Sequence, residues 1–254
     1  MKNSVKIVIV ITYMLAVLAS SCGRINEGIK VKPSGVTKIV TKEVPEFDKI
    51  KVSGNFQVIV NIGDASKVVI KADSAFIPYI ITGVDKNKKL NISIRKGINV
   101  VGYNDLRVIV TTPSLNSLEG LGYNITKIKN LKTDKFYANL LLSSRLEANI
   151  NCNIINIDCK GGNYIKLQGK ANKCYINISG ESYIGAVNFI TKNLNVNGSI
   201  SSYVGIFVND SIEANLSGSS CIYYYGVPKY INTSRTWTSK LVKNNDKKIM
   251  RYEN

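Results

Sequence analysis

The chain has 254 residues, with 34 Lys and Arg against 17 Asp and Glu, a formal net charge of +17 and no histidine. The lack of histidine excludes Ser-His and Cys-His catalysis, histidine metal sites and the usual general base near neutral pH. The basic residues are spread along the chain without a nucleic-acid-binding motif, so we expect nonspecific attraction to polyanions and no specific nucleic-acid partner. A solvated surface that reflects biased composition is the alternative.

The first 21 residues have the features of a secretory signal. Lys2 and Lys6 precede an apolar run over residues 7–19, which is too short to span a membrane but fits the hydrophobic region of a signal peptide. The following Ser20-Ser21-Cys22 resembles a bacterial lipoprotein signal, in which the cysteine is acylated and becomes the first mature residue, although Ala19 stands where Leu is usual. We therefore expect lipid attachment at Cys22, with ordinary secretion and cleavage near Ser21 as the alternative.

The next part of the chain changes from irregular sequence to strands. Residues 23–38 show no alternation and contain Pro33-Ser34-Gly35, which predicts a tether between membrane and fold. From residue 39, short runs rich in Val and Ile lie between Gly, Asp and Asn turns, as in hairpins and meanders. The predicted strands are residues 47–52, 56–62, 67–72, 90–94 and 105–111. Residues 74–81 allow a helical turn or a bulge, since Pro78 forbids a long regular element.

Residues 118–228 repeat a unit of eighteen to twenty-one residues, each with an alternating apolar run, a Gly/Ser turn and a final apolar anchor. The anchors are Ile125, Leu146, Ile165, Ile184, Val204 and Ile222. A fixed period of this length indicates a solenoid, and the period-2 alternation indicates strands. We predict an all-β fold, a right-handed parallel β-helix with an N-terminal β-rich portion. The predicted domain covers residues 39–238, with N-terminal strands over 39–113, coils over 114–238 and a charged tail over 239–254.

Several motifs follow one another in a fixed order along the mature chain: residues 43–54, 58–60, 90–94, 108–115 and 225–228. This ordered set resembles the bacterial family described as "putative auto-transporter adhesin, head GIN domain". The resemblance covers about residues 39–237. It implies a secreted or lipid-anchored protein, and the family name implies adhesion. It implies no catalytic residue. The Ser-Gly turns typical of the family are replaced here by Gly120–Gly122 and Leu142–Ser144.

The register of the repeats predicts a polar column on the outside of the solenoid, seven residues before each anchor. The Val204 unit fits only if Ser199–Ser202 carries a two-residue insertion. With it, the column is Asn139, Asp158, Asn177, Asn195 and Asn215. Stacked amides can hydrogen-bond along the axis and stabilise the fold. The alternative function is a polar strip that receives glycan hydroxyls.

A second outward column lies one residue before each anchor and contains Tyr164, Tyr183 and Tyr203, preceded by Arg145. Exposed tyrosines offer rigid amphipathic area, so this column is the candidate surface for sugar rings or a partner protein. Cross-strand stacking that only stabilises the sheet is the alternative. Tyr223-Tyr224-Tyr225, beside Pro228 and near Trp237, is predicted to seal the last coil.

The residues of the repeats do not form a catalytic or metal-binding pattern. No two acidic residues stack in adjacent coils, so the carboxylate pair of a glycosidase is not expected. Glu147 is expected to stack near Lys166 as an ordinary surface pair. The remaining cysteines match no zinc spacing and are expected to be unpaired thiols, with Cys159 and Cys174 facing inward: Cys152, Cys159, Cys174 and Cys221. We expect neither a metal nor a cofactor.

These observations favour a non-catalytic lipoprotein of the bacterial cell envelope, at the outer membrane, with an adhesin-like binding surface. The expected partners are the membrane, through the N-terminal lipid, and a glycan or a surface protein. Two other functions stay open, a β-helix carbohydrate-active enzyme and a structural envelope protein without a ligand. Formation of a homo-oligomer also stays open.

Overall fold

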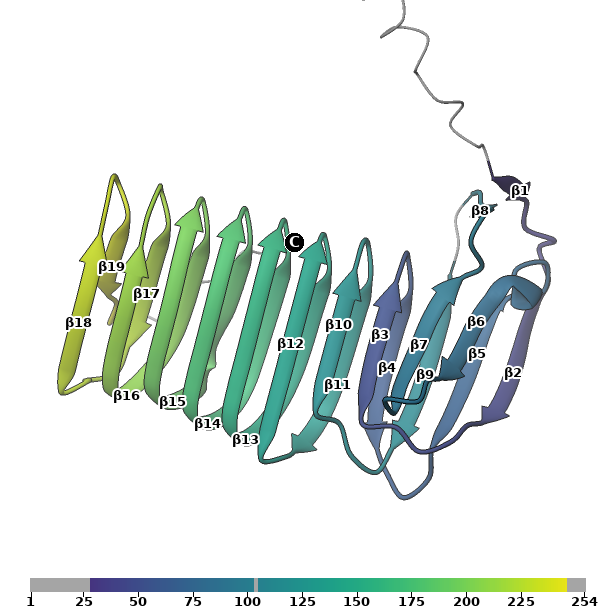
Figure 1. The fold of residues 1–254 in the computed structure, drawn as a ribbon, viewed down its shortest axis with the longest axis horizontal. Coiled ribbons are helices and arrows are strands. Elements are labelled where there is room, and N and C mark those ends of the chain that lie inside the picture. Colours follow the sequence, from purple (N-terminus) through teal and green to yellow (C-terminus); the bar gives the residue numbers. More distant parts are fainter. Residues whose placement is uncertain (1–27, 103–104, 246–254) are drawn as a thin grey trace, which may run out of the picture.

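The computed structural model describes residues 28–102 and 105–245, so the predicted leader and Cys22 lie outside the described residues. The described chain is built of strands and one short 3-10 helix, η1 (Ile77–Tyr79), which lies where a helical turn was predicted. The strands form a two-stranded and a seventeen-stranded sheet. The larger sheet winds as a right-handed parallel solenoid, as the repeat predicts (Figure 1). No helix in the described part of the chain has the length and hydrophobicity needed to cross a membrane.

The strands, in chain order, are β1 (Ile29–Val31), β2 (Thr37–Glu43), β3 (Lys49–Ser53), β4 (Gln57–Ile62), β5 (Lys67–Asp73), β6 (Ile80–Val84), β7 (Lys89–Ile94), β8 (Ile98–Val100), β9 (Arg107–Thr112), β10 (Ser117–Leu121), β11 (Ile125–Lys132), β12 (Lys135–Leu142), β13 (Arg145–Gly161), β14 (Tyr164–Gly180), β15 (Tyr183–Ile200), β16 (Tyr203–Leu216), β17 (Cys221–Tyr225), β18 (Tyr230–Arg235) and β19 (Lys240–Lys243). They include all the strands predicted before residue 113, with shifts of one or two residues at their ends.

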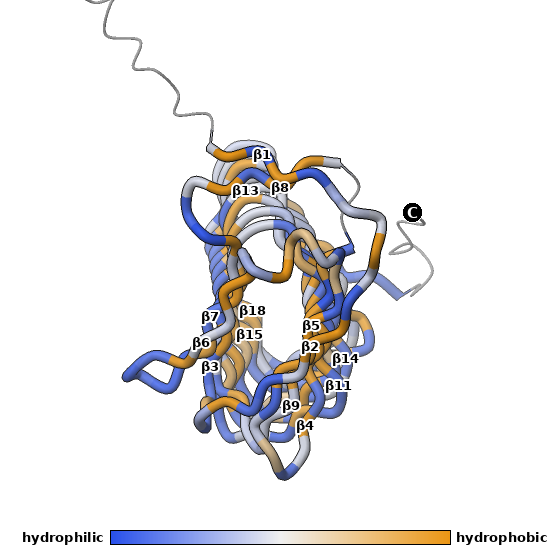
Figure 2. The backbone as a smooth tube through the Cα atoms, turned by 90° about the vertical axis from the view of Figure 1, so that its right-hand side faces the viewer, coloured by the Kyte–Doolittle hydropathy of each residue, from blue (hydrophilic) through white to orange (hydrophobic). Residues whose placement is uncertain are grey.

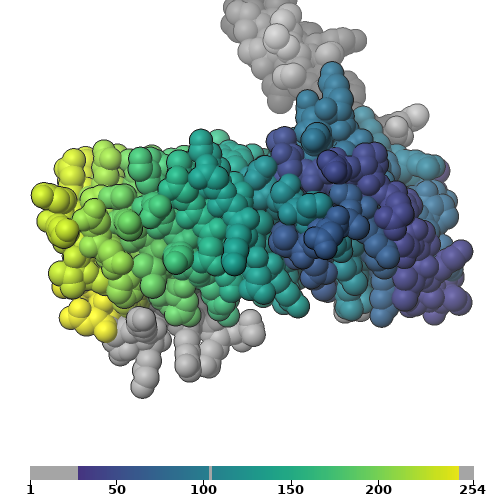
Figure 3. All heavy atoms as spheres, turned by 90° about the horizontal axis from the view of Figure 1, so that it is seen from below, coloured from purple at the N-terminus to yellow at the C-terminus, as the bar shows by residue number. Residues whose placement is uncertain are grey.

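Each coil crosses two flat faces. One face, called the amide face below, carries β7, β3, β10, β12, the second halves of β13 to β16, and β18, all parallel. The other face, called the tyrosine face, carries β9, β4, β11, the first halves of β13 to β16, β17 and β19. Seen along the axis, the backbone forms a flattened tube (Figure 2). In space-filling view the coils follow one another in chain order along its length (Figure 3).

The N-terminal end of the solenoid is closed by antiparallel strands. β5 pairs antiparallel with β9, β2 with β5, and β6 with β7. Phe47, Phe56 and Phe76 are buried in this part of the core. A solenoid needs such a cap because its end coil would otherwise expose an apolar layer and an open strand edge.

Both ends of the fold differ from the prediction. Within the predicted tether, β1 pairs with β8, so the prediction of an irregular segment is wrong there. At the other end, β18 and β19 add strands beyond Tyr223-Tyr224-Tyr225, and Trp237 is 93% exposed, so the predicted aromatic cap is also wrong. These last strands face solvent at the open end, and β18 is accordingly polar in sequence. They therefore lack the apolar alternation that marks the earlier coils.

The register differs from the prediction at two places. Thr126, not Ile125, aligns with the anchor Leu146. The two-residue insertion at 199–202 does not exist, because Asn177 pairs with Asn197 and Ile178 with Gly198. The polar column therefore contains Asn197 instead of Asn195. The longer interval of this unit arises earlier, where β15 gains one residue between Gly185 and Asn188.

The turn from the amide face to the tyrosine face is the same in successive coils, and we call this row of turns the turn edge. It contains one residue of positive φ in each coil: Gly54, Gly122, Leu142, Gly161, Gly180, Ile200, Gly218 and Trp237. A buried polar side chain follows: Asn124, Ser144, Asn163, Ser182, Ser202, Ser220 and Ser239. Several of these donate to a carbonyl of the preceding coil, as Ser182 Oγ does to Gly161 O at 2.7 Å. The chain thereby satisfies carbonyl groups where the strand ladder is interrupted.

Inward-facing side chains form one continuous hydrophobic core along the axis. Each fully buried Ile, Leu or Val stabilises the fold by roughly 1.5–3 kcal/mol. The anchor Ile184 is fully buried, whereas Asn177 in the neighbouring coil is exposed on the amide face.

We expect Ile184→Lys to lower the free energy of unfolding by about 3 kcal/mol or more, because it buries an unpaired charge. The matched variant Asn177→Lys should cost about 1 kcal/mol or less, since it loses one exposed hydrogen bond. Urea denaturation followed by circular dichroism measures both. Equal losses for the two variants would contradict the inward and outward assignment.

Candidate functional site

The structure brings the predicted tyrosine column together on the tyrosine face. Tyr164, Tyr183 and Tyr203 occupy one register column on adjacent coils. Their ring centroids lie 5.2 and 5.4 Å apart, with interplanar angles of 12° and 11°. This geometry is an offset stack, because the coil spacing of about 4.8 Å sets the ring spacing. All three rings are half-buried.

Arg145 extends the stack by one coil toward the N-terminal end. It pairs with Tyr164 in the register, and its guanidinium carbon lies 4.9 Å from the centroid of that ring. The guanidinium group is exposed and carries a positive charge. A cation over a tyrosine face is worth about 0.5–1 kcal/mol at an exposed site. The stack therefore ends in a fixed positive charge.

Tyr223 extends the stack toward the C-terminal end, although its position in the repeat does not predict it there. Cys221 occupies the register position opposite Tyr203, as predicted, but the ring that packs on Tyr203 belongs to Tyr223. Their centroids lie 5.1 Å apart at 36°. Burial and the interaction with Tyr223 raise the pKa of Tyr203. The sequence does allow this contact, because Tyr223 lies two residues after Cys221 and residues two apart in a strand share a face.

Glycines make room for the tyrosine rings. Gly185 lies two residues after Tyr183, and a Cβ built there would lie 3.1 Å from Tyr183 Cε1. Gly205 takes the same position after Tyr203 and is buried. In the preceding coils this column holds Glu147 and Lys166, which pair in the register as expected. Glu147 nevertheless forms an ion pair with Lys127, at 3.2 Å.

The stacked arrangement determines what the tyrosines can offer to a ligand. Because each ring lies against its neighbours, the ring faces are already occupied within the protein. The hydroxyls of Tyr203 and Tyr223 also interact with each other. A phenol has one donor and two acceptor positions, so the outer ring edges and further hydrogen-bonding capacity of the row can still contact a partner. A row of phenols with a period of about 5 Å presents repeated hydrogen-bonding groups beside narrow apolar strips.

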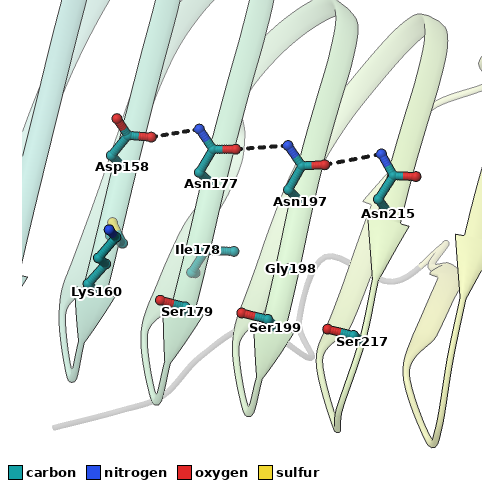
Figure 4. A pocket seen from close by; sticks show the side chains of 11 residues that line it. Asp158, Lys160, Asn177, Ile178, Ser179, Asn197, Gly198, Ser199, Asn215 and Ser217 are labelled. Atoms are coloured by element: carbon teal, nitrogen blue, oxygen red, sulfur yellow. Dashed lines mark hydrogen bonds between the residues drawn. The ribbon is translucent and has the colours of Figure 1, made fainter.

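The polar column on the amide face forms a hydrogen-bonded ladder (Figure 4). Asn177 Nδ2 donates to Asp158 Oδ1 at 2.7 Å, Asn197 Nδ2 to Asn177 Oδ1 at 2.8 Å, and Asn215 Nδ2 to Asn197 Oδ1 at 3.1 Å. Tyr137 donates to Asp158, which raises the pKa of Tyr137 to about 12. The amides thus use one another as partners, which supports the structural function of the ladder over a glycan-binding one.

A shallow pocket of about 330 Å³ lies beside this ladder. Ser179, Ser199 and Ser217 line it in a second column, with Lys160 at one end. The pocket has no acidic residue other than Asp158, whose carboxylate already accepts from Asn177 and Tyr137. It therefore offers weak polar contacts and no acid–base pair.

The remaining ionisable groups that the structure describes do not converge on a reactive site. Glu119 pairs with Lys51 and Lys89, and Asp210 with Lys229. Among residues 28–102 and 105–245, no group of three Cys, Asp or Glu side chains is placed to hold a metal ion.

The four cysteines of the described chain form no disulfide, and Cys159 and Cys174 are buried as predicted. Desolvation raises the pKa of the Cys152 thiol to about 11 and that of Cys159 to about 12. Since the thiolate is the reactive form, these residues are poor nucleophiles at neutral pH.

Comparison with known proteins agrees with this architecture. The model of the family described as "Putative auto-transporter adhesin, head GIN domain" matches residues 46–228, and the chain belongs to this family. A crystal structure of a putative adhesin from Bacteroides fragilis has 21% sequence identity and a TM-score of 0.78, covering 84% of this chain and 100% of that chain. A putative adhesin from Parabacteroides merdae has 16% identity and a TM-score of 0.64, covering 85% and 100%. These identities support the fold alone. No curated protein matches the chain significantly.

The glycine beneath Tyr183 provides a test of the stack. We expect Gly185→Val to displace the Tyr183 ring, because the added Cβ would lie 3.1 Å from Cε1. Valine suits a strand, so the fold should persist. The near-ultraviolet circular dichroism of the tyrosines should fall while the far-ultraviolet spectrum stays unchanged. Asn188→Val, at an exposed position of the same strand, is the control. An unchanged tyrosine signal in Gly185→Val would show that the rings do not depend on this space.

Proposed function

We propose that this member of the head GIN domain family is a non-catalytic lipoprotein of the bacterial cell envelope that binds a glycan on its tyrosine face. The observation that carries the proposal is the continuous row of Arg145, Tyr164, Tyr183, Tyr203 and Tyr223 across adjacent coils. Envelope location and adhesin-like character are supported by the family. The ligand and the lipid anchor are our inference.

The geometry favours a long ligand over a small enclosed one. The described pockets are shallow depressions on the faces, whereas small-molecule sites are usually concave and bury most of the ligand. The tyrosine row is linear and follows the solenoid axis. An extended polysaccharide can place successive hydroxyl groups along such a row, and Arg145 can pair with an acidic substituent at one end.

Binding through this row should depend on the hydroxyls, since stacking occupies the ring faces. Each hydrogen bond contributes about 0.5–1.5 kcal/mol net, so several in a row are needed for useful affinity. A ligand surface built from such weak hydrogen bonds therefore needs a tyrosine in each of several successive coils.

We expect the triple variant Tyr164→Phe, Tyr183→Phe, Tyr203→Phe to keep the stack and the fold but to lose affinity by at least about tenfold, equivalent to about 1.4 kcal/mol. The triple Ala variant should lose binding completely. A glycan array with the purified mature protein, followed by titration of the bound glycan, measures the change.

Tyr175→Phe on the amide face is the matched control and should bind like the wild type. If both triple variants bind every glycan unchanged, the row is structural. Capture of a protein ligand with the same tyrosine dependence would replace the glycan with a surface protein. Turnover of a polysaccharide on the array would overturn the non-catalytic assignment and favour the carbohydrate-active alternative.

The lipid anchor is tested separately from the ligand. We expect cells grown with labelled palmitate to label the wild-type protein and not the Cys22→Ala variant, because acylation needs the thiol. The wild type should fractionate with the outer membrane. Cys152→Ala, which changes a thiol within the solenoid, is the control and should label normally. Labelling that persists in Cys22→Ala, or no labelling of the wild type, would contradict the anchor. Protease treatment of intact cells then distinguishes a surface from a periplasmic position.

A further inference from the structure

The turn edge exposes large apolar side chains over much of its length. Tyr123, Leu142, Ile200 and Trp237 are 74%, 59%, 60% and 93% exposed. They lie on four of the seven turns from Gly122 to Trp237, with glycine turns between Leu142 and Ile200 and between Ile200 and Trp237. The distance from first to last is about 29 Å at a coil spacing of about 4.8 Å. Scattered single apolar residues on a surface are ordinary, but a row of them along one edge usually marks an interaction site.

Three of these residues occupy backbone positions that favour glycine. Leu142, Ile200 and Trp237 have φ of 71°, 68° and 60° in the column that holds glycine in the neighbouring coils. The left-handed conformation costs a non-glycine residue about 1–2 kcal/mol, and more for a β-branched one. Their side chains are mostly exposed, so burial within the fold offsets only part of this cost. Strain retained at an exposed position points to a function outside the fold.

The described chain begins at this same edge. The amide-face strand β7 runs toward the turn edge, and β8, which follows it, pairs with β1 (Figure 1). Ile29 in β1 is 68% exposed, and Gly28 is the first described residue. Cys22 precedes Gly28 by six residues, which span at most about 20 Å when fully extended. A lipid on Cys22 therefore places the turn edge close to the bilayer.

The charge of the edge also suits a membrane surface. Exposed basic residues lie at the strand ends that flank this edge, namely Lys160, Arg235 and Lys240, and the turns between them carry one exposed acidic residue, Glu181. Tryptophan and tyrosine favour the interfacial region of a bilayer, while lysine and arginine are attracted by anionic headgroups. The apolar and basic side chains occur on the same edge.

We infer that the turn edge docks on the surface of a bilayer containing anionic lipids, with Leu142, Ile200 and Trp237 inserted among the headgroups. The inference deepens the proposed function, because it rests on the lipid anchor at Cys22. The solenoid axis then lies along the membrane, and both faces stand upright on it. The tyrosine row then runs parallel to the membrane, at the start of the strands that leave the turn edge.

Trp237 is the one tryptophan of the chain, so its fluorescence reports the edge directly. We use the mature chain with Cys22→Ala, which carries no lipid, and vesicles of phosphatidylethanolamine with phosphatidylglycerol. The expected result is a blue shift of the emission and reduced quenching by acrylamide. High salt and pure phosphatidylcholine vesicles should weaken the effect because the headgroup attraction is electrostatic. An unchanged spectrum at low salt would overturn the inference.

The variant Leu142→Gly/Ile200→Gly keeps the tryptophan and relieves the backbone strain. We expect its melting temperature to be equal to or above that of the wild type, and its partition onto the anionic vesicles to fall by at least tenfold. The control Val227→Ser/Tyr230→Ser removes exposed apolar side chains where the chain turns at the opposite edge and should leave partition unchanged. Equal partition of the glycine variant, or equal loss in the control, would contradict docking through the turn edge.

Two further readouts separate the alternatives. Sedimentation without vesicles should show the same monomeric mass for the wild type and the glycine variant. If the wild type instead associates and the glycine variant does not, the edge is an interface between copies and the inference fails. Palmitate labelling of lipid-bearing protein should be the same with and without the glycine substitutions. Normal palmitate labelling without vesicle binding would contradict docking through the turn edge and leave the lipid anchor supported. Vesicle binding without palmitate labelling would contradict the lipid anchor alone.

Discussion

Every coil of this protein turns the same corner, and the structure depends on that turn. Each corner has one residue of positive φ, and from Gly122 onward a small buried polar side chain follows it. Several of these side chains satisfy backbone groups of the adjacent coil. Both features act at the same point of the repeat, so they hold the following strands in parallel register. Once the register is held, each inward position stacks on its equivalent, and a single apolar core forms along the axis. The hydrophobic pattern determines which side faces in, whereas the corner determines where each coil begins.

In-register stacking also determines what the outer surface can offer. A residue type that occurs once in a repeat occurs as a column on the surface, with a spacing of about 4.8 Å. Amides in such a column bond to one another and become part of the scaffold, as Asn177 and Asn197 do. Phenols behave differently, because their rings stack through their faces and a hydroxyl that makes one hydrogen bond can still accept another. The same stacking therefore leaves the amides of the amide face hydrogen-bonded to one another, whereas the tyrosine face keeps hydrogen-bonding groups for a partner.

The solenoid and the tyrosine column could be predicted from sequence because both depend on period-2 alternation around a repeated turn. The errors arose where hydrophobicity was used to define the register. Hydrophobicity favours Ile125 over Thr126 as the anchor, yet the residue aligned with Leu146 is the fully buried Thr126. The insertion at 199–202 was inferred to keep apolar residues in the column where the structure accepts Gly198, packed against Leu216. Tyr223 was missed because a long side chain can reach a stack from the next outward position, which register alone does not reveal.

The departures from the glycine pattern at the corner are the most informative positions in the repeat. Glycine at this column relieves backbone strain in Gly161, Gly180 and Gly218, so an apolar residue there raises the energy of the fold. The turn with Ile200 also leaves the buried Ser202 hydroxyl without a hydrogen-bond partner among the described residues. A turn that is both strained and incompletely bonded does not arise from packing, because the side chain it carries is exposed. The simplest physical account is that the stabilising contacts of Leu142, Ile200 and Trp237 lie outside the chain, at a surface wide enough to reach several coils at once.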